Sequence, residues 1–152
     1  MNFTGKKEEP QVAPPQNRYE SIVKYMAKSV IYFGPEQSIY EAIDLMLERR
    51  ISGGPVLNDA GDLIGILSEK DCLRIIVDAA YHNHPNHQGQ VKDYMSTNVT
   101  TVDISSDVLD VANMFLNSNF RRYPVIENGK LKGQVSRRDI MRAASKLRTA
   151  TW

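Results

Sequence analysis

Residues 120–126 read Phe-Arg-Arg-Tyr-Pro-Val-Ile, and residues 133–139 read Gly-Gln-Val-Ser-Arg-Arg-Asp. A related pair of stretches comes earlier, with Ile-Ser-Gly-Gly-Pro-Val-Leu at 51–57 and Gly-Ile-Leu-Ser-Glu-Lys-Asp at 65–71. Pro55 matches Pro124 at an offset of 69 residues, and Asp71 matches Asp139 at an offset of 68 after a gap of one residue. Matches at these offsets continue on both sides, so the chain is predicted to hold two copies of one unit.

Each copy is predicted to fold as β-α-β-β-α after a short leading helix. The leading helices are expected at 19–27 and 90–95, and the first strands at 30–33 and 99–102. Polar residues that favour the N-cap position precede the four longer helices. Glycines that permit a positive φ mark the two hairpin turns. The capping residues are Ser38, Ser68, Asp107 and Ser136, and the turn glycines are Gly61 and Gly129. The expected fold class is α/β (α+β).

Size and composition set limits on the class of protein. The chain has 152 residues, a formal net charge of +1 and a single cysteine, Cys72. A unit of about 60 residues rarely buries a sufficient core alone, so the two copies are expected to pack on each other. No apolar run approaches the length of about 18 residues that spans a bilayer, and the N-terminus has no apolar signal region. We expect a cytoplasmic protein without a membrane segment or internal disulfide.

The two copies resemble CBS domains, and the pair resembles a Bateman module. The motifs quoted above carry this resemblance, which covers about residues 19–148. It implies two repeats packed sheet to sheet with pseudo-two-fold symmetry and two clefts between them, and frequent assembly into dimers. It also implies binding of adenosine compounds in the clefts and regulation of an attached or partner protein. The predicted divisions are a flexible tail 1–17, CBS repeat 1 at 19–81, a linker 82–90 and CBS repeat 2 at 91–148.

The Ser-x-x-Asp pattern at 136–139 is a candidate ligand site. A helix that begins after Ser136 presents free backbone N–H groups and the positive end of its dipole, which suit an anion. A carboxylate one turn later, at Asp139, can accept two hydrogen bonds from a vicinal diol. The resemblance implies the same roles, with Asp on ribose and Ser near ribose or phosphate. The alternative is an N-cap with no ligand.

The resemblance implies that each cleft combines the Ser and Asp of one repeat with the first strand of the other. Cleft A is predicted to consist of Ser29, Val30, Ile31, Arg121, Arg122, Tyr123, Pro124, Ser136, Arg138 and Asp139. Cleft B is predicted to consist of Asn98, Val99, Thr100, Gly53, Gly54, Pro55, Ser68 and Asp71.

Charge is distributed unevenly between the two copies. Residues 19–81 contain six Lys/Arg and ten Asp/Glu, whereas residues 91–148 contain ten Lys/Arg and six Asp/Glu. Guanidinium groups suit phosphate oxygens, so cleft A, with Arg121 and Arg122, is predicted to bind the phosphate of an adenine nucleotide, with AMP favoured. The alternative is a solvated or internally paired basic face. Cleft B has Lys70 as its nearest cation and is expected to take an uncharged adenosine moiety or to be empty, unless Gly53 and Gly54 serve close packing alone.

Three functions compete: a stand-alone regulatory module that binds a nucleotide and signals to an unidentified protein, a ligand-free dimerisation module, and an enzyme. The sequence has no Ser/His/Asp set, P-loop or paired carboxylates, so we expect no enzyme and no catalytic cofactor. The acidic first repeat argues against nucleic acid as a partner, and a homodimer is expected. His82, His84 and His87 are expected to form a solvated linker and no metal site. Trp152 is expected either to pack on a partner or to remain exposed.

Overall fold

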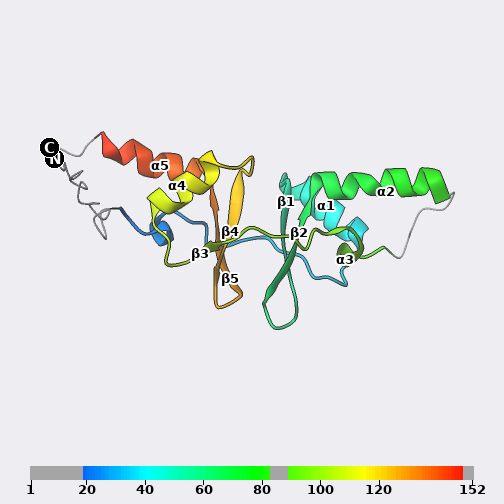
Figure 1. The fold of residues 1–152 in the computed structure, drawn as a ribbon. Helices are drawn as coiled ribbons and strands as arrows, with labels where there is room; N and C mark the ends of the chain where they lie inside the picture. The colour runs from blue at the N-terminus through cyan, green and yellow to red at the C-terminus, as the bar shows by residue number, and fades with distance from the viewer. Residues whose placement is uncertain (1–18, 83–88, 149–152) are drawn as a thin grey trace, which may run out of the picture.

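The computed structural model describes residues 19–82 and 89–148. The predicted tail 1–17, linker residues His84 and His87, and Trp152 lie outside this part of the chain. Two small sheets face each other in the middle of the molecule, and the helices cover their outer sides (Figure 1). The elements in chain order are η1 (Ile22–Lys24), α1 (Ile39–Arg49), β1 (Gly53–Leu57), β2 (Leu63–Ser68), α2 (Glu69–His82), α3 (Val91–Tyr94), β3 (Val102–Asp103), α4 (Val108–Leu116), β4 (Arg122–Glu127), β5 (Lys130–Ser136) and α5 (Arg137–Leu147).

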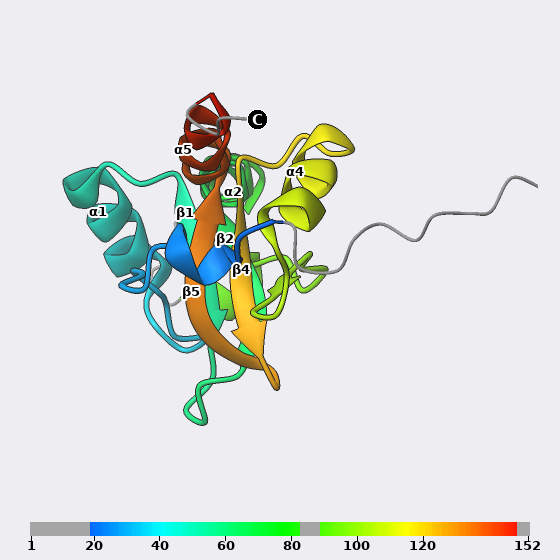
Figure 2. The same cartoon turned by 90° about the vertical axis from the view of Figure 1, so that its left-hand side faces the viewer.

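The two sheets have equivalent topologies. β1 pairs antiparallel with β2, whereas the second sheet has the order β3-β4-β5 with β3 parallel to β4. Phe33 bridges to Val56 in parallel, in the place that Val102 takes beside β4. Figure 2 shows one sheet lying behind the other. The predicted mixed fold of two repeats is therefore confirmed.

The leading segments of the two repeats are exchanged between them. Ala27 bridges to Gln134 of the second sheet, and Ser96 bridges to Ile66 of the first. Ile22 is fully buried in the core of the second repeat, while Val91 and Tyr94 are buried in the core of the first. Each hydrophobic core therefore contains residues from both of the sequence ranges predicted for the repeats, 19–81 and 91–148. These ranges stay a prediction of where each repeat begins and ends along the chain.

This exchange corrects four predicted elements. The leading helices are shorter than expected, because bridges at Ser21 and Ala27 leave room for only the single 3-10 turn of η1 between them; α3 likewise has four residues. The first strands at 30–33 and 99–102 are reduced to the bridge at Phe33 and the two residues of β3. The reason is that residues 28–32 and 97–101 cross from one sheet to the other.

Three of the four predicted caps are confirmed. Ser68, Asp107 and Ser136 each accept a hydrogen bond from the backbone N–H three residues later. Ser38 precedes α1 but its side chain makes no capping hydrogen bond. The N–H of Ile39 instead donates to the carbonyl of Gly89 at 3.0 Å, so a distant segment satisfies this helix start.

The tips of the two hairpins join the repeats at one end of the sheets. Lys130 Nζ lies 2.7 Å from Asp62 Oδ1 and donates to the carbonyl of Ala60 at 2.6 Å. The backbone N–H of Leu63 also donates to the carbonyl of Gly129 at 3.1 Å. The hydrogen bond from Lys130 lowers the pKa of Asp62. These contacts hold the sheets together at the hairpin end.

Candidate functional site

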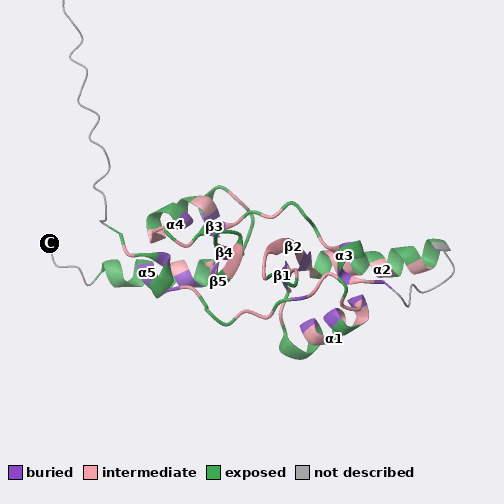
Figure 3. Cartoon of the chain, turned by 90° about the horizontal axis from the view of Figure 1, so that it is seen from below, coloured by how far each residue is buried: buried purple, intermediate pink, exposed green. Residues whose placement is uncertain are grey.

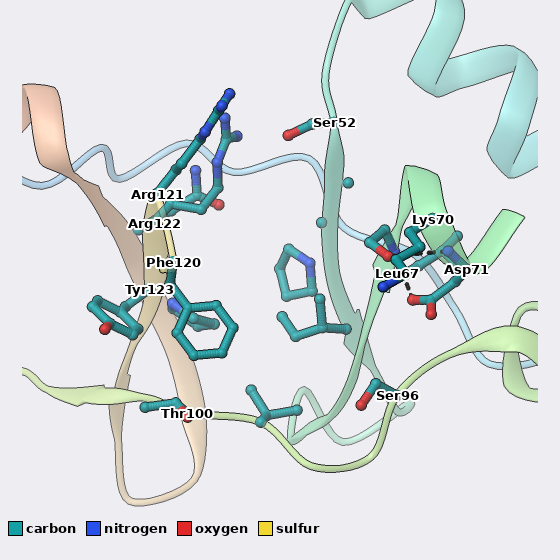
Figure 4. Close-up of a pocket in the computed structure, with 18 of the residues that line it drawn as sticks. Ser52, Leu67, Lys70, Asp71, Ser96, Thr100, Phe120, Arg121, Arg122 and Tyr123 are labelled. Carbon is teal, nitrogen blue, oxygen red and sulfur yellow. Dashed lines mark hydrogen bonds between the residues drawn. The ribbon is translucent and has the colours of Figure 1, made fainter. Parts of the chain in front are cut away.

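A cavity of about 740 Å³ lies between the two repeats. One wall is formed by β1 and the start of α2, the other by β4 and the loop before it, and the crossing segment at 98–100 also lines it (Figure 4). We call this space the central cavity. Its volume falls within the range of about 300–1,000 Å³ that is typical of small-molecule sites.

All of the residues predicted for cleft B line the central cavity: Gly53, Gly54, Pro55, Ser68, Asp71, Asn98, Val99 and Thr100. The glycine at 54 is required by close packing, since a Cβ there would lie 2.8 Å from the carbonyl oxygen of Ile31. The Gly53-Gly54 pair therefore allows close packing of the backbone and also lines the cavity. Lys70 also lines the cavity, as the sequence suggested.

The residues predicted for cleft A divide into two groups. Four of them line the central cavity with Asp71: Arg121, Arg122, Tyr123 and Pro124. The other six are not part of its wall: Ser29, Val30, Ile31, Ser136, Arg138 and Asp139. The central cavity thus brings Arg121 and Arg122 together with the residues predicted for cleft B, while the rest of the cleft A grouping stays a prediction. Figure 4 shows Arg121 and Arg122 opposite Asp71 and Lys70.

The carboxylate at Asp71 has one oxygen free of hydrogen bonds to the described residues. Its Oδ2 accepts from the N–H of Ser68 at 2.9 Å, within a reciprocal capping pair. Its Oδ1 lies 3.8 Å from Arg74, which is too long for a hydrogen bond. The side chain is 21% exposed and borders the cavity. Asp71 can therefore accept hydrogen bonds from a ligand.

The equivalent carboxylate at Asp139 is fully engaged. Its Oδ2 accepts from the N–H of Ser136 at 2.7 Å, and its Oδ1 accepts from Arg142. The same guanidinium donates to the carbonyl of Tyr25 in the exchanged leading segment at 3.2 Å. The Asp139 side chain is only 12% exposed. Here the capping alternative describes the observed contacts, although the sequence patterns at 68–71 and 136–139 are alike.

Aromatic residues on the β4 wall have different environments. Tyr123 is buried, with its ring against Phe115 and its hydroxyl donating to the carbonyl of Met114 at 3.2 Å. It is chiefly a core residue, although it also borders the central cavity. Phe120 is 53% exposed and points into the central cavity (Figure 4). In the first repeat the matching position is Ile51.

Other reactive groups do not extend this site. Burial raises the pKa of the Cys72 thiol, which disfavours a nucleophilic thiolate. Residues 19–82 and 89–148 contain no group of three His, Cys, Asp or Glu side chains that could hold a metal ion. Within the same residues, no helix has both the length and the apolar character needed to cross a membrane.

The fold and cavity define a class: tandem α/β repeats whose sheets face each other around a shared central cavity. The family model of the CBS domain matches residues 21–78 and again 91–146. The chain therefore belongs to the CBS domain family.

Two curated relatives illustrate the range of the family. The chain is 28% identical to protein MJ1225 of Methanocaldococcus jannaschii over 123 residues, which are 81% of this chain and 42% of that one. It is 27% identical to the CBS domain-containing protein CBSX2, chloroplastic, of Arabidopsis thaliana over 141 residues, covering 77% and 59%. The chain thus spans about half of the length of these relatives.

A solved structure similar to this fold is the crystal structure of CBSX2 in complex with AMP. The TM-score is 0.72 at 28% sequence identity, and the match covers 84% of this chain and 98% of that one. The paired CBS architecture is therefore shared with a protein that has been crystallised with a nucleotide.

Proposed function

We propose that this protein is a regulatory module that binds an adenine nucleotide, with AMP preferred, in the central cavity. The observation that supports this most directly is the pairing of complementary groups across the cavity. On one wall, Asp71 offers a carboxylate oxygen that has no hydrogen bond and only a 3.8 Å ion pair with Arg74, and Arg121 and Arg122 lie on the other. Neither guanidinium has a hydrogen bond or ion pair with another described residue.

The chemistry of the two walls matches the two polar parts of a nucleotide. A carboxylate accepts from a ribose diol, and guanidinium groups donate to phosphate oxygens. Phe120, Pro55 and Val99 offer apolar surface between them for a base. The AMP complex of CBSX2 supports this ligand class. Among described residues, the cavity wall holds no histidine or cysteine, which favours binding over catalysis.

Replacing Arg121 and Arg122 together by alanine is expected to weaken AMP binding by about tenfold or more, because charge-assisted hydrogen bonds to phosphate are lost. Affinity for adenosine, which lacks phosphate, should change little. Isothermal titration with AMP, ADP, ATP and adenosine measures both effects. Arg148→Ala, which removes one positive charge from the end of α5, is the control. Unchanged AMP affinity in the double variant would contradict the proposed phosphate site.

A ligand that touches both repeats can act as a signal. If AMP contacts Asp71 of one repeat and Arg122 of the other, it favours the relative position of the repeats that makes both contacts. Such a ligand shifts a conformational equilibrium by its differential affinity for the two states. We propose that a separate protein binds one of the two states preferentially and so responds to the nucleotide. Membership of the CBS domain family supports a regulatory role of this kind.

A second function, homodimerisation, is favoured by an apolar stripe on α2. Ile76 is 69% exposed and Tyr81 is 82% exposed, and Leu73 and Val77 are also exposed. Figure 3 shows that most of α2 is exposed. Exposed apolar patches on a helix commonly mark interaction sites. We propose that two copies of the chain pack through this stripe, with or without nucleotide.

Ile76→Glu is expected to convert a dimer into a monomer in sedimentation velocity, since it places a charge within the packed stripe. AMP affinity should persist, because Ile76 is not part of the central cavity. Leu47→Glu changes another exposed leucine, on α1, and is the matched control. A wild-type protein that is monomeric at all concentrations would refute the dimer, and an unaltered dimer in Ile76→Glu would refute this interface.

A further inference from the structure

The loop that precedes β4 ends in Arg121 and leads directly into Arg122, the first residue of the strand, and both arginines line the central cavity. α4 ends at Leu116 and β4 begins at Arg122, so residues 117–121 have no partner strand. Such loops are usually mobile, and a mobile loop must be ordered at an entropic cost when a ligand binds. The affinity for phosphate therefore depends on what holds this loop in place.

Arg137, the first residue of α5, makes three hydrogen bonds to this loop. Its Nε donates to the carbonyl of Phe120 at 2.8 Å, and a terminal guanidinium nitrogen donates to the carbonyl of Ser118 at 3.3 Å. Its backbone N–H donates to the carbonyl of Arg121 at 3.0 Å. The Arg137 guanidinium thus donates to backbone carbonyls and does not line the cavity.

The first repeat lacks this arrangement. Glu69 occupies the position of Arg137, and its backbone N–H donates to the carbonyl of Ser52 at 3.0 Å. A carboxylate side chain has no N–H to donate to further carbonyls. The first repeat instead anchors its loop with Ile51, which packs against the hydrophobic core. Phe120, at the matching place in the second repeat, borders the cavity and has its ring centroid 5.6 Å from that of Tyr123, so the polar contacts of Arg137 add to a limited apolar contact there.

We propose that Arg137 is a positioning residue for nucleotide binding: it fixes residues 118–121 so that Arg121 and Arg122 face the central cavity. This proposal rests on the proposed function for its ligand. Arg137→Ala is expected to weaken AMP binding by about fivefold to tenfold, the loss of one or two modest hydrogen bonds. Since Arg137 is exposed, the variant should fold.

A double-mutant cycle separates positioning from general destabilisation. In protein that already carries Arg121→Ala and Arg122→Ala, adding Arg137→Ala should change AMP affinity by less than about twofold, because the groups it positions are gone. An equal loss of affinity in both backgrounds would overturn the proposal. The control Arg148→Ala removes an arginine from the opposite end of the same helix and should leave AMP binding unchanged.

Hydrogen exchange of the ligand-free protein tests the hold on the loop directly. Amides of residues 117–122 are expected to exchange faster in Arg137→Ala than in wild type or Arg148→Ala. Equal exchange in all three proteins would overturn the proposal. If wild-type protein fails to bind AMP, the proposed function fails, and the exchange comparison alone decides whether Arg137 holds the loop.

Discussion

Ile22→Ala is expected to lower the free energy of unfolding by about 2–5 kcal/mol, the usual cost of removing a fully buried isoleucine side chain beyond Cβ. Ile22 is 0% exposed and belongs to the core that contains Val111 and Phe115 of the second repeat. In sequence, however, it belongs to the leading segment of the first repeat. The large effect is therefore a consequence of the exchange of leading segments. Urea unfolding measures it.

The neighbouring Val23 supplies a matched control for this prediction. Val23 is 37% exposed in the same 3-10 turn, so Val23→Ala should change stability by less than about 0.5 kcal/mol. If both variants lose equal stability, Ile22 does not occupy the second core. Hydrogen exchange adds a local readout: Ile22→Ala should accelerate exchange around Val111, whereas Val91→Ala should do so around Val56 of the first core.

Features that depend on neighbouring residues were predictable from the sequence. The repeats, the hairpins and the caps at Ser68, Asp107 and Ser136 rest on periodicity, glycine placement and short-range hydrogen bonding. Ser38 is the exception, because its capping role is taken by the carbonyl of Gly89. A contact of that kind joins residues 50 positions apart and leaves no local pattern.

Features that depend on pairing between the repeats were not predictable in the same way. The bridges of Ala27 to Gln134 and of Ile66 to Ser96 decide which sheet each crossing segment joins. They also decide that Arg121 faces Asp71 across one cavity. The sequence indicated the chemical groups of the site, whereas their grouping depends on how the two sheets face each other.

The two carboxylates provide the sharpest test of that grouping. Asp71→Asn is expected to weaken AMP binding by about 10- to 100-fold, because an NH₂ donor takes the place of the Oδ1 acceptor that faces the ribose diol and the negative charge is lost. The backbone contact to Ser68 can persist through the remaining oxygen, so the cost in stability should be about 1 kcal/mol. Titration calorimetry and urea unfolding measure the two quantities.

Asp139→Asn is expected to lower stability more than it lowers AMP affinity, the opposite of Asp71→Asn. The NH₂ of the new amide would face either Arg142 or the backbone N–H of Ser136, both of which are donors. One of these two donors would then lose its hydrogen bond, which should lower the free energy of unfolding by about 1–3 kcal/mol. AMP affinity should change by less than about twofold, since Asp139 does not line the central cavity. A variant that kept its stability but lost AMP binding would move the site to Asp139 and restore the sequence-based grouping of cleft A. The predicted pattern, in which one carboxylate governs binding and its counterpart governs stability, follows from the hydrogen bond of Arg142 to Asp139, whereas Arg74 forms only a longer ion pair with Asp71.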